Sequence, residues 1–270
     1  PEEVIKCCKK FKIKKIKILL IMYNGGYPQN SYLFQKFKKV YGCYIVEDSC
    51  HALGATYKFR KKKYKIGSCA HSDIATFSFH PLKSITTGEG GAITTNVRKI
   101  YDKLITLRSI GIKRSNKHWN YNVTELGLNF RLSDIQCALG ISQFKKLKIF
   151  IRKRKKISQI YDQEILNEKN VFSIKHENEY NSAFHLYFLK LKNFNINKKN
   201  KLFDYMKAQG VTLQYHYIPI YKFKIFKDKC INENAKIYFN SALSLPIFYE
   251  LSKTNQILIL ELLKKFFKKN

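Results

Sequence analysis

The sequence has no apolar run long enough to cross a membrane. Its longest run, Ile18 to Met22, falls far short of the roughly 20 residues that a spanning helix needs. The first residues, Pro1-Glu2-Glu3, are acidic and no apolar segment follows them directly, so we predict no signal peptide. Disorder is excluded as a description of the whole chain, because 45% of its 270 residues are hydrophobic and 14% are aromatic.

Cysteine occurs in no pattern that favours pairing or metal binding. The seven cysteines are an odd number, include no CxxC pair and have no regular spacing. This argues against a disulfide framework and a zinc site, so we predict no metal and a reducing, cytoplasmic compartment. The cysteines are Cys7, Cys8, Cys43, Cys50, Cys69, Cys137 and Cys230.

Acidic residues are scarce, because 19 Asp and Glu stand against 51 Lys and Arg and give a net charge of +32. Such a surplus can favour nucleic acid or an anionic membrane surface. Here the lysines are spread among Ile, Asn, Phe and Tyr, as in residues 9–17 and 145–156. A general composition bias explains this spread, and we find no RNP, helix-turn-helix or zinc signature. We therefore expect no nucleic-acid and no membrane partner, and keep a basic nucleic-acid binder as the weakest alternative.

Short apolar stretches alternate with helical patterns in the first 150 residues, which favours an α/β sheet covered on both faces. Strands are predicted at residues 17–23, 43–46, 74–79 and 92–95. Helices are predicted at residues 31–40, 97–107 and from Ser133 to about residue 165, with a loop at 108–121. The remainder predicts an α+β unit, with strands at 183–191 and 211–215 and helices at 200–209, 234–241 and 254–268.

Two segments place polar residues beside strand ends. In residues 46–55 a strand delivers Asp48 at its carboxyl end, where ligands bind in open α/β sheets, although a helix N-cap explains Asp48 equally well. In residues 72–92, Lys83 lies between a strand and a glycine-rich turn, and its apolar neighbours would lower the pKa of its amine for covalent chemistry. Taken alone, Lys83 is one basic residue among 51. Hydroxyls that could donate to a phosphate are those of Ser78, Ser84, Thr86 and Thr87.

A third segment, residues 125–140, places Asn129 and Arg131 just before a helix start. This arrangement suits an anion site or a subunit contact. A capped helix with small, closely packed residues explains it as well.

Together these segments resemble the DegT/DnrJ/EryC1/StrS family of sugar aminotransferases. The strongest match is FSFHPLKSITTGEGGAITTN, residues 77–96, and VEDSCHALGA and ELGLNFRLSDIQCALG match two further signatures in the same order. HYIPIY (216–221) and ALSLPIF (242–248) match later landmarks. The resemblance implies the aspartate aminotransferase-like fold type I of pyridoxal-phosphate (PLP) enzymes, a mixed, mostly parallel sheet with a smaller C-terminal α+β domain. It assigns residues 1–150 to the remainder of the large PLP-binding domain and 151–270 to the small domain.

The resemblance also implies the cofactor, pyridoxal 5'-phosphate, and its contacts. Lys83 would carry the cofactor covalently and move protons. Asp48 would pair with the protonated pyridine nitrogen, and His51 would lie near the ring and its 3-hydroxyl. Ser78 would hold the phosphate, which Asn129 would reach from a neighbouring subunit, so a homodimer is implied.

Within the family, the sequence of these motifs is most similar to that of the pseudaminic-acid branch. The enzymes of this branch aminate a UDP-linked 4-keto-6-deoxy-N-acetyl-hexosamine. His216 and Tyr217 would approach this sugar, although packing is the more common role for such residues in an aromatic strand. The amino donor would be an amino acid, and we expect glutamate. Some family members carry His at the lysine position and do not transaminate, whereas this chain has Lys83.

Family members begin well upstream of the position of Pro1. That upstream stretch normally supplies a Gly/Ser/Thr-rich helix N-terminus for the phosphate and an aromatic residue that stacks on the ring, and we find no candidate for either before Asp48. The sequence therefore predicts a fragment. The alternative to a working aminotransferase is an inactive remnant with a structural or interaction role.

Overall fold

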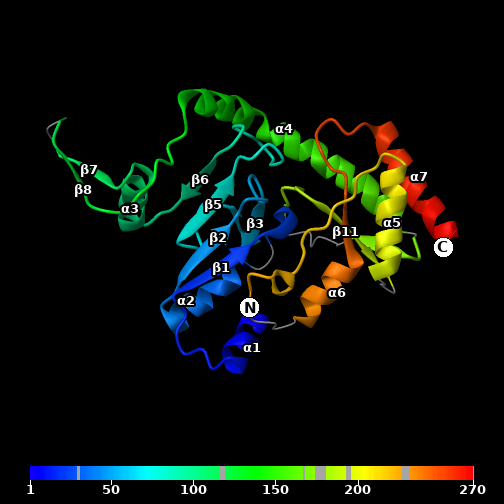
Figure 1. Ribbon diagram of the computed structural model, residues 1–270, viewed down its shortest axis with the longest axis horizontal. Helices are drawn as coiled ribbons and strands as arrows, with labels where there is room; N and C mark the ends of the chain where they lie inside the picture. The colour runs from blue at the N-terminus through cyan, green and yellow to red at the C-terminus, as the bar shows by residue number, and fades with distance from the viewer. Residues whose placement is uncertain are drawn as a thin grey trace. The chain divides into compact units, whose positions relative to one another are not determined.

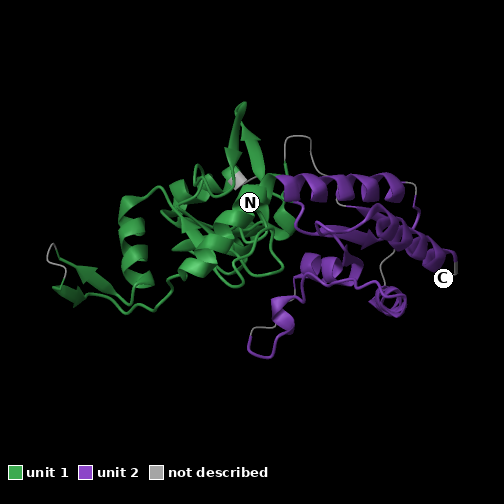
Figure 2. Ribbon diagram, turned by 90° about the horizontal axis from the view of Figure 1, so that it is seen from above, with its two compact units in different colours: residues 1–148, 179–183 green, residues 149–178, 184–270 purple. Residues whose placement is uncertain are grey.

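The computed structural model describes residues 1–28, 31–115, 119–166, 168–173, 181–192, 196–226 and 232–269. The chain forms two compact units, which Figure 2 colours separately. Unit 1 holds Pro1–Lys148 and Glu179–Ala183, and unit 2 holds Ile149–Asn178 and Phe184–Asn270. Within the described ranges, no helix is both long and apolar enough to cross a membrane.

Unit 1 is built on a four-stranded sheet in the order β1-β2-β5-β6. Its strands are β1 (Ile18–Met22), β2 (Tyr44–Asp48), β5 (Ile74–Ser78) and β6 (Gly91–Thr94). The first three run parallel and β6 runs antiparallel to β5, as the neighbouring arrows of Figure 1 show. All four strands fall where the apolar runs predict them, within one or two residues at each end.

One face of this sheet is buried and the other is largely uncovered. Ile45 and Ala75 are fully buried on the first face, in a cluster with Tyr23, Tyr57 and Phe77. On the opposite face of the edge strand β1, Ile18 and Leu20 are 61% and 64% exposed. In this part of the sheet the described residues therefore cover one face, whereas the alternation of strands and helices predicts cover on both.

The remaining elements of unit 1 connect the strands or lie at its ends. They are α1 (Glu2–Lys10), η1 (Asn24–Gly26), η2 (Ser31–Phe34), α2 (Gln35–Tyr41), α3 (Arg98–Arg108), and two antiparallel hairpins, β3 (Thr56–Phe59) with β4 (Lys62–Lys65) and β7 (Ile112–Arg114) with β8 (Tyr121–Val123). The prediction of a simple loop over 108–121 is wrong, because it misses β7 and the start of β8. These strands are short and mostly exposed, so they carry no apolar alternation that a sequence pattern could detect.

Buried Asp73 fixes α2 against the sheet. Its carboxylate forms an ion pair with Lys38 of α2 and accepts a hydrogen bond from the backbone N–H of Ile45 at 2.9 Å. Its backbone carbonyl accepts from the Thr95 hydroxyl at 2.6 Å. One side chain and its carbonyl thus join a helix, a central strand and the end of β6.

Unit 2 contains most of the long helix α4 (Asp134–Ile165) and a three-stranded antiparallel sheet in the order β11-β10-β9. Its other elements are β9 (Val171–Ser173), β10 (Tyr187–Leu191), β11 (Ala242–Leu245), α5 (Ile196–Ala208), η3 (Ile220–Lys222), α6 (Glu233–Ser241) and α7 (Lys253–Lys269). Its core includes Leu189, Leu202 and Met206, all fully buried. Arg154 of α4 is buried and donates to the carbonyl oxygens of His185 and Ile247 at 3.2 and 2.7 Å.

Two strand predictions in unit 2 need correction. The predicted strand at 211–215 forms only one bridge, between Gln214 and Ser244, so it is not a strand. The predicted strand at 183–191 begins only at Tyr187; Ala183 belongs to unit 1, where its N–H donates to the carbonyl of Gly26 at 3.1 Å. The sequence patterns also miss β9 and do not identify β11 as a strand.

Candidate functional site

Asp48 and Ser78 end the two central strands, β2 and β5, at the same edge of the unit 1 sheet. Met22, Asp48 and Thr76 are paired across three parallel strands, so their side chains share one face, and Ser78 lies on that face two residues beyond Thr76. Asp48 Oδ1 accepts a hydrogen bond from the backbone N–H of Cys50 at 3.1 Å. The carboxyl ends of parallel strands are where open α/β sheets bind ligands.

His51 lies just beyond β2 and is buried, with 3% of its surface exposed. Its Nδ1 accepts a hydrogen bond from the backbone N–H of Gly25 at 3.2 Å, which places the imidazole proton of the neutral form on Nε2. Gly26 follows with φ +89°, and a Cβ there would collide with the carbonyl oxygen of His51. The turn after β1 can therefore approach His51 only because glycine occupies this position.

Two buried polar atoms at this edge have no hydrogen-bond partner among the described residues. They are Asn24 Oδ1, after β1, and Ser49 Oγ, after β2. Buried polar atoms are normally paired, so this edge of the sheet has hydrogen-bonding capacity that a polar ligand could use.

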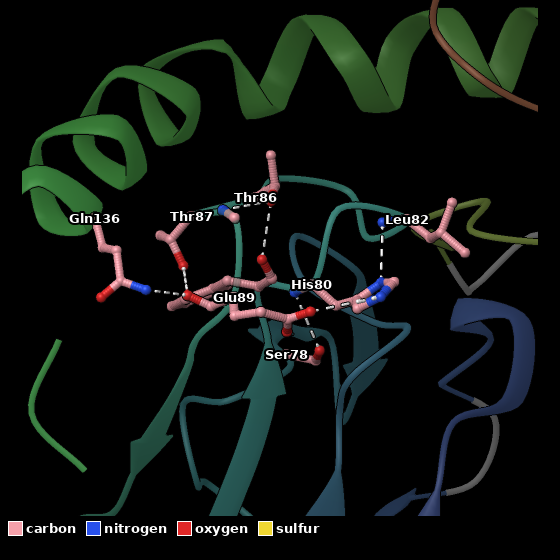
Figure 3. Close-up of polar contacts among 9 residues, drawn as sticks. Ser78, His80, Leu82, Thr86, Thr87, Glu89 and Gln136 are labelled. Carbon is pink, nitrogen blue, oxygen red and sulfur yellow. Dashed lines mark hydrogen bonds and ion pairs between the residues drawn. The ribbon is translucent and has the colours of Figure 1, made fainter. Parts of the chain in front are cut away.

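Lys83 lies in the loop of residues 79–90, which joins β5 to β6 and is fixed by its own side chains. The Thr86 hydroxyl donates to the carbonyl of Phe79 at 3.0 Å and accepts from the N–H of Gly88 at 2.9 Å. The Thr87 hydroxyl donates to the carbonyl of Glu89 at 2.7 Å. Figure 3 shows these bonds spanning the loop. The expectation that Thr86 and Thr87 donate to a phosphate is therefore wrong here, because both hydroxyl protons already serve the loop.

The start of α4 holds the same loop from outside. Ser133 and Gln136 form a capping box, in which the N–H of Gln136 donates to Ser133 Oγ at 3.3 Å and the N–H of Ser133 donates to Gln136 Oε1 at 3.0 Å. The remaining amide group of Gln136, Nε2, donates to the carbonyl of Glu89 at 2.9 Å (Figure 3). The Ser-x-x-Gln spacing predicts the cap, whereas only the structure reveals the contact with Glu89.

Lys83 and Asp48 both influence the pKa of the Cys50 thiol. Burial, a hydrogen bond to Asp48 and the charge of Asp48 raise the pKa of Cys50 to about 11, while the positive charge of Lys83 opposes that rise. Cys50 is therefore a protonated thiol at neutral pH and no nucleophile. Lys83 itself is half-buried, with Ile85 buried beside it and Leu82 exposed. Asp48 and Lys83, 35 positions apart in the sequence, thus lie in one electrostatic neighbourhood, with Ser78 at the same strand ends.

Asn129 is exposed, and its backbone forms an antiparallel bridge with Ser109. It lies in a segment whose apolar side chains are also exposed, among them Leu126 at 100% and Phe130 at 67%. No described contact joins Asn129 to the strand ends of Asp48 and Ser78. Its assigned contact with a neighbouring subunit stays a prediction.

His216 and Tyr217 belong to unit 2. The imidazole of His216 forms a hydrogen bond through Nδ1 with the hydroxyl of buried Ser244 on β11, at 2.8 Å, and Tyr217 is 48% exposed. The bond to Ser244 fixes the ring of His216. The sequence offers no signal for this pairing, because the two residues are 28 positions apart in the chain.

Comparison with known proteins gives consistent matches. A sequence model of the DegT/DnrJ/EryC1/StrS aminotransferase family matches residues 15–264. The UDP-4-amino-4,6-dideoxy-N-acetyl-beta-L-altrosamine transaminase of Campylobacter jejuni is 38% identical over 218 residues, which is 79% of this chain and 56% of that protein. The chain therefore spans little more than half the length of this curated relative.

Solved structures show the same fold. Helicobacter pylori PseC, an aminotransferase involved in the biosynthesis of pseudoaminic acid, has a TM-score of 0.88 at 27% identity and covers 96% of this chain and 70% of its own. The PLP form of the sugar aminotransferase Spr1654 from Streptococcus pneumoniae has a TM-score of 0.81 at 24% identity, covering 94% of this chain and 69% of its own. At 24% identity, the similarity to Spr1654 supports a shared fold and nothing more specific.

Proposed function

The chain belongs to the DegT/DnrJ/EryC1/StrS aminotransferase family, and we propose that the protein is a PLP-dependent aminotransferase acting on a nucleotide-linked 4-keto-6-deoxy sugar. The observation that carries this proposal is the convergence of Asp48, Ser78 and the Lys83 loop at one edge of the sheet. An acid, a hydroxyl and an amine are the groups that such a cofactor requires for its ring nitrogen, its phosphate and its aldehyde carbon.

The residues present fit the cofactor. Asp48 Oδ1 accepts from the N–H of Cys50, and a carboxylate has further lone pairs with which Asp48 could accept from the pyridine N–H. The neutral form of His51 carries its proton on Nε2, because Nδ1 accepts from the N–H of Gly25, and Ser78 supplies a hydroxyl at the end of β5. Lys83 supplies the amine that would hold the cofactor and then accept and return a proton at Nζ. When bound, the cofactor supplies a ring that withdraws electrons from the carbon next to the transferred nitrogen.

The substrate assignment rests on the relatives. The Campylobacter relative is named for a UDP-linked dideoxy amino sugar and PseC for pseudoaminic acid, and we transfer that substrate class, with UDP as the nucleotide, to this protein. His216, oriented by Ser244, and Tyr217 are proposed to contact the sugar. Glutamate is the proposed amino donor.

We also propose a homodimer, a domain division and a compartment. The exposed apolar side chains around Asn129 suit a subunit contact that brings Asn129 to a partner's cofactor phosphate. Unit 1 would correspond to the large, cofactor-binding domain and unit 2 to the small one. The six described cysteines are free thiols, which suits a reducing compartment such as the cytoplasm.

Covalent trapping tests the function. The protein is mixed with PLP, reduced with borohydride and digested, and the peptides are analysed by mass spectrometry. We expect one reduced adduct, at Lys83, and none in Lys83→Arg, which keeps the charge but lacks a nucleophilic amine. Lys99→Arg, at an exposed position on α3, is the matched control and should keep the adduct. Equal labelling of many lysines, with Lys83 not preferred, would contradict the proposal.

An inactive remnant is the second candidate, and a specific observation favours it. On one face of β1, Ile18 and Leu20 are left exposed by the described residues. If this candidate is right, no adduct forms at Lys83 in the 270-residue chain, while thermal unfolding remains cooperative.

A further inference from the structure

The β3–β4 hairpin of unit 1 concentrates positive charge to a degree that the rest of the chain does not. Of the eight residues 58–65, all but Phe59 and Tyr64 are basic, and every one of these basic side chains is exposed. The basic residues are Lys58, Arg60, Lys61, Lys62, Lys63 and Lys65. In the described part of the chain, none of them forms an ion pair with a carboxylate.

The strand register separates two faces of the hairpin. Lys58 lies directly opposite Lys63, and Lys65 follows two residues further along the same face. Tyr57 lies opposite Tyr64 on the other face. One face therefore carries three lysines across two adjacent strands, and the other carries the aromatic rings together with Lys62, which lies opposite Phe59.

The aromatic face anchors the hairpin to unit 1. Tyr57 forms a hydrogen bond with buried His71, and the rings of Phe59 and Tyr64 lie edge-on to that imidazole at 5.1 and 4.9 Å. Tyr32 stacks on Phe59 at 4.4 Å. Because these rings pack against unit 1, the lysine face is held in a fixed, outward orientation.

Two features of the hairpin cost stability without serving the fold. Lysines directly opposite each other repel, which destabilises a two-stranded pair. At the tip, Arg60 and Lys61 both have positive φ, 48° and 65°, a conformation that hairpin turns normally give to Asn and Gly. The basic side chains at these two positions extend the positive charge of the hairpin to its tip.

We propose that the outward face of the β3–β4 hairpin binds an anionic phospholipid surface. Each lysine or arginine near an anionic lipid surface contributes about 1 kcal/mol of attraction, and clusters of four to eight on amphipathic helices bind such surfaces. Five of the six cations are lysines, which contact phosphate as point charges, and the aromatic rings face inward, where they offer no platform for stacked bases. These features favour a flat, phosphate-bearing surface over nucleic acid. The sequence pattern predicts no membrane partner, because lysines are spread along the whole chain. That spread hides the local cluster of basic residues in the hairpin.

Vesicle co-sedimentation tests the proposal. Wild-type protein should bind vesicles that contain about one third phosphatidylglycerol, and this binding should weaken as the salt concentration rises. It should not bind vesicles of pure phosphatidylcholine. The variant Lys58→Gln/Lys63→Gln/Lys65→Gln should partition about 100-fold less, at about fivefold per lysine. Lys253→Gln/Lys265→Gln/Lys268→Gln, at exposed positions on α7, removes the same charge and should change partitioning only slightly.

A second variant separates binding from folding. Arg60→Asn/Lys61→Gly gives the tip its preferred turn residues, so it should raise the melting temperature and still weaken vesicle binding. Equal losses in the hairpin and α7 variants would overturn the proposal in favour of general charge attraction. Hairpin-dependent binding to duplex DNA with no binding to vesicles would overturn it in favour of nucleic acid.

Discussion

At the scale of single residues, Lys199 of α5 is a lysine whose side chain is fully buried among aromatic rings. Its ammonium group lies 4.2 Å from the ring centre of Tyr215 and 4.3 Å from that of Phe239, and it donates to the carbonyl of Phe239. Burial, and then the charge of Lys222, lower the pKa of Lys199 to about 8. The rings and the carbonyl offset part of the cost of burying the charge.

This lowered pKa makes stability depend on pH. Between the folded value near 8 and the unfolded value of 10.5, the unfolded chain binds the proton more tightly, so the free energy of unfolding should rise with pH. Between pH 7.5 and 10, the free energy of unfolding should rise by about 2 kcal/mol less in Lys199→Met than in the wild-type protein. Urea denaturation at both pH values measures it. Lys201→Met, at an exposed position on the same helix, should leave the rise intact, and an unchanged slope in Lys199→Met would refute the assignment.

At the scale of elements, the helix start at Ser133 has two functions that can be separated. It caps α4, and through Gln136 it holds the loop that carries Lys83. Glutamate at position 136 would keep the acceptor of the capping box but lose the Nε2–H that binds the carbonyl of Glu89.

We therefore expect Gln136→Glu to loosen the loop and not the helix. Loss of one hydrogen bond of about 1 kcal/mol should speed amide hydrogen exchange at Thr87 and Gly88 about fivefold, with exchange in the first turns of α4 unchanged. Ser133→Ala is the opposite case, because it should destabilise the helix start by about 1 kcal/mol while Gln136 can still reach Glu89. Exchange at Thr87 and Gly88 as slow as in wild type would show that the contact with Glu89 does not hold the loop.

At the scale of the whole molecule, unit 1 exposes several large apolar side chains in and beside the start of α4, a feature typical of contact surfaces. Leu126 is 100% exposed, and Ile135 and Phe144 are 83% and 59% exposed at or near the start of α4. Covering such side chains yields about 1.5–3 kcal/mol each, so association is expected.

We predict that the protein self-associates through the segment that carries Leu126 and Ile135. Leu126→Asp/Ile135→Asp should weaken self-association at least about 100-fold and shift the protein toward monomer in light scattering after size exclusion. Both side chains are exposed, so folding should be kept. Ile225→Asp, at an 83% exposed position in unit 2, serves as control and should leave the mass unchanged. If the double variant keeps the wild-type mass, the subunit contact lies elsewhere.

Much of unit 1 could be predicted from local sequence. β1, β2, β5 and β6 follow from apolar runs that turn residues interrupt, and the start of α4 follows from Ser133 and its partner three residues later. The order of the motifs around Asp48, Lys83 and Asn129 was enough to identify the family. These signals are local, because each needs only neighbours a few residues apart.

Only the tertiary structure determines which distant residues form hydrogen bonds with each other. It joins Gln136 to Glu89 and His216 to Ser244, and it turns the hydroxyls of Thr86 and Thr87 toward their own loop. It also places Lys58, Lys63 and Lys65 on one outward face of the β3–β4 hairpin, an arrangement that the amino-acid composition alone does not reveal. The physical reason is the same in each case. Hydrogen bonds and burial depend on distances between segments far apart in the sequence, and the chain sets those distances only once its sheet and helices have packed.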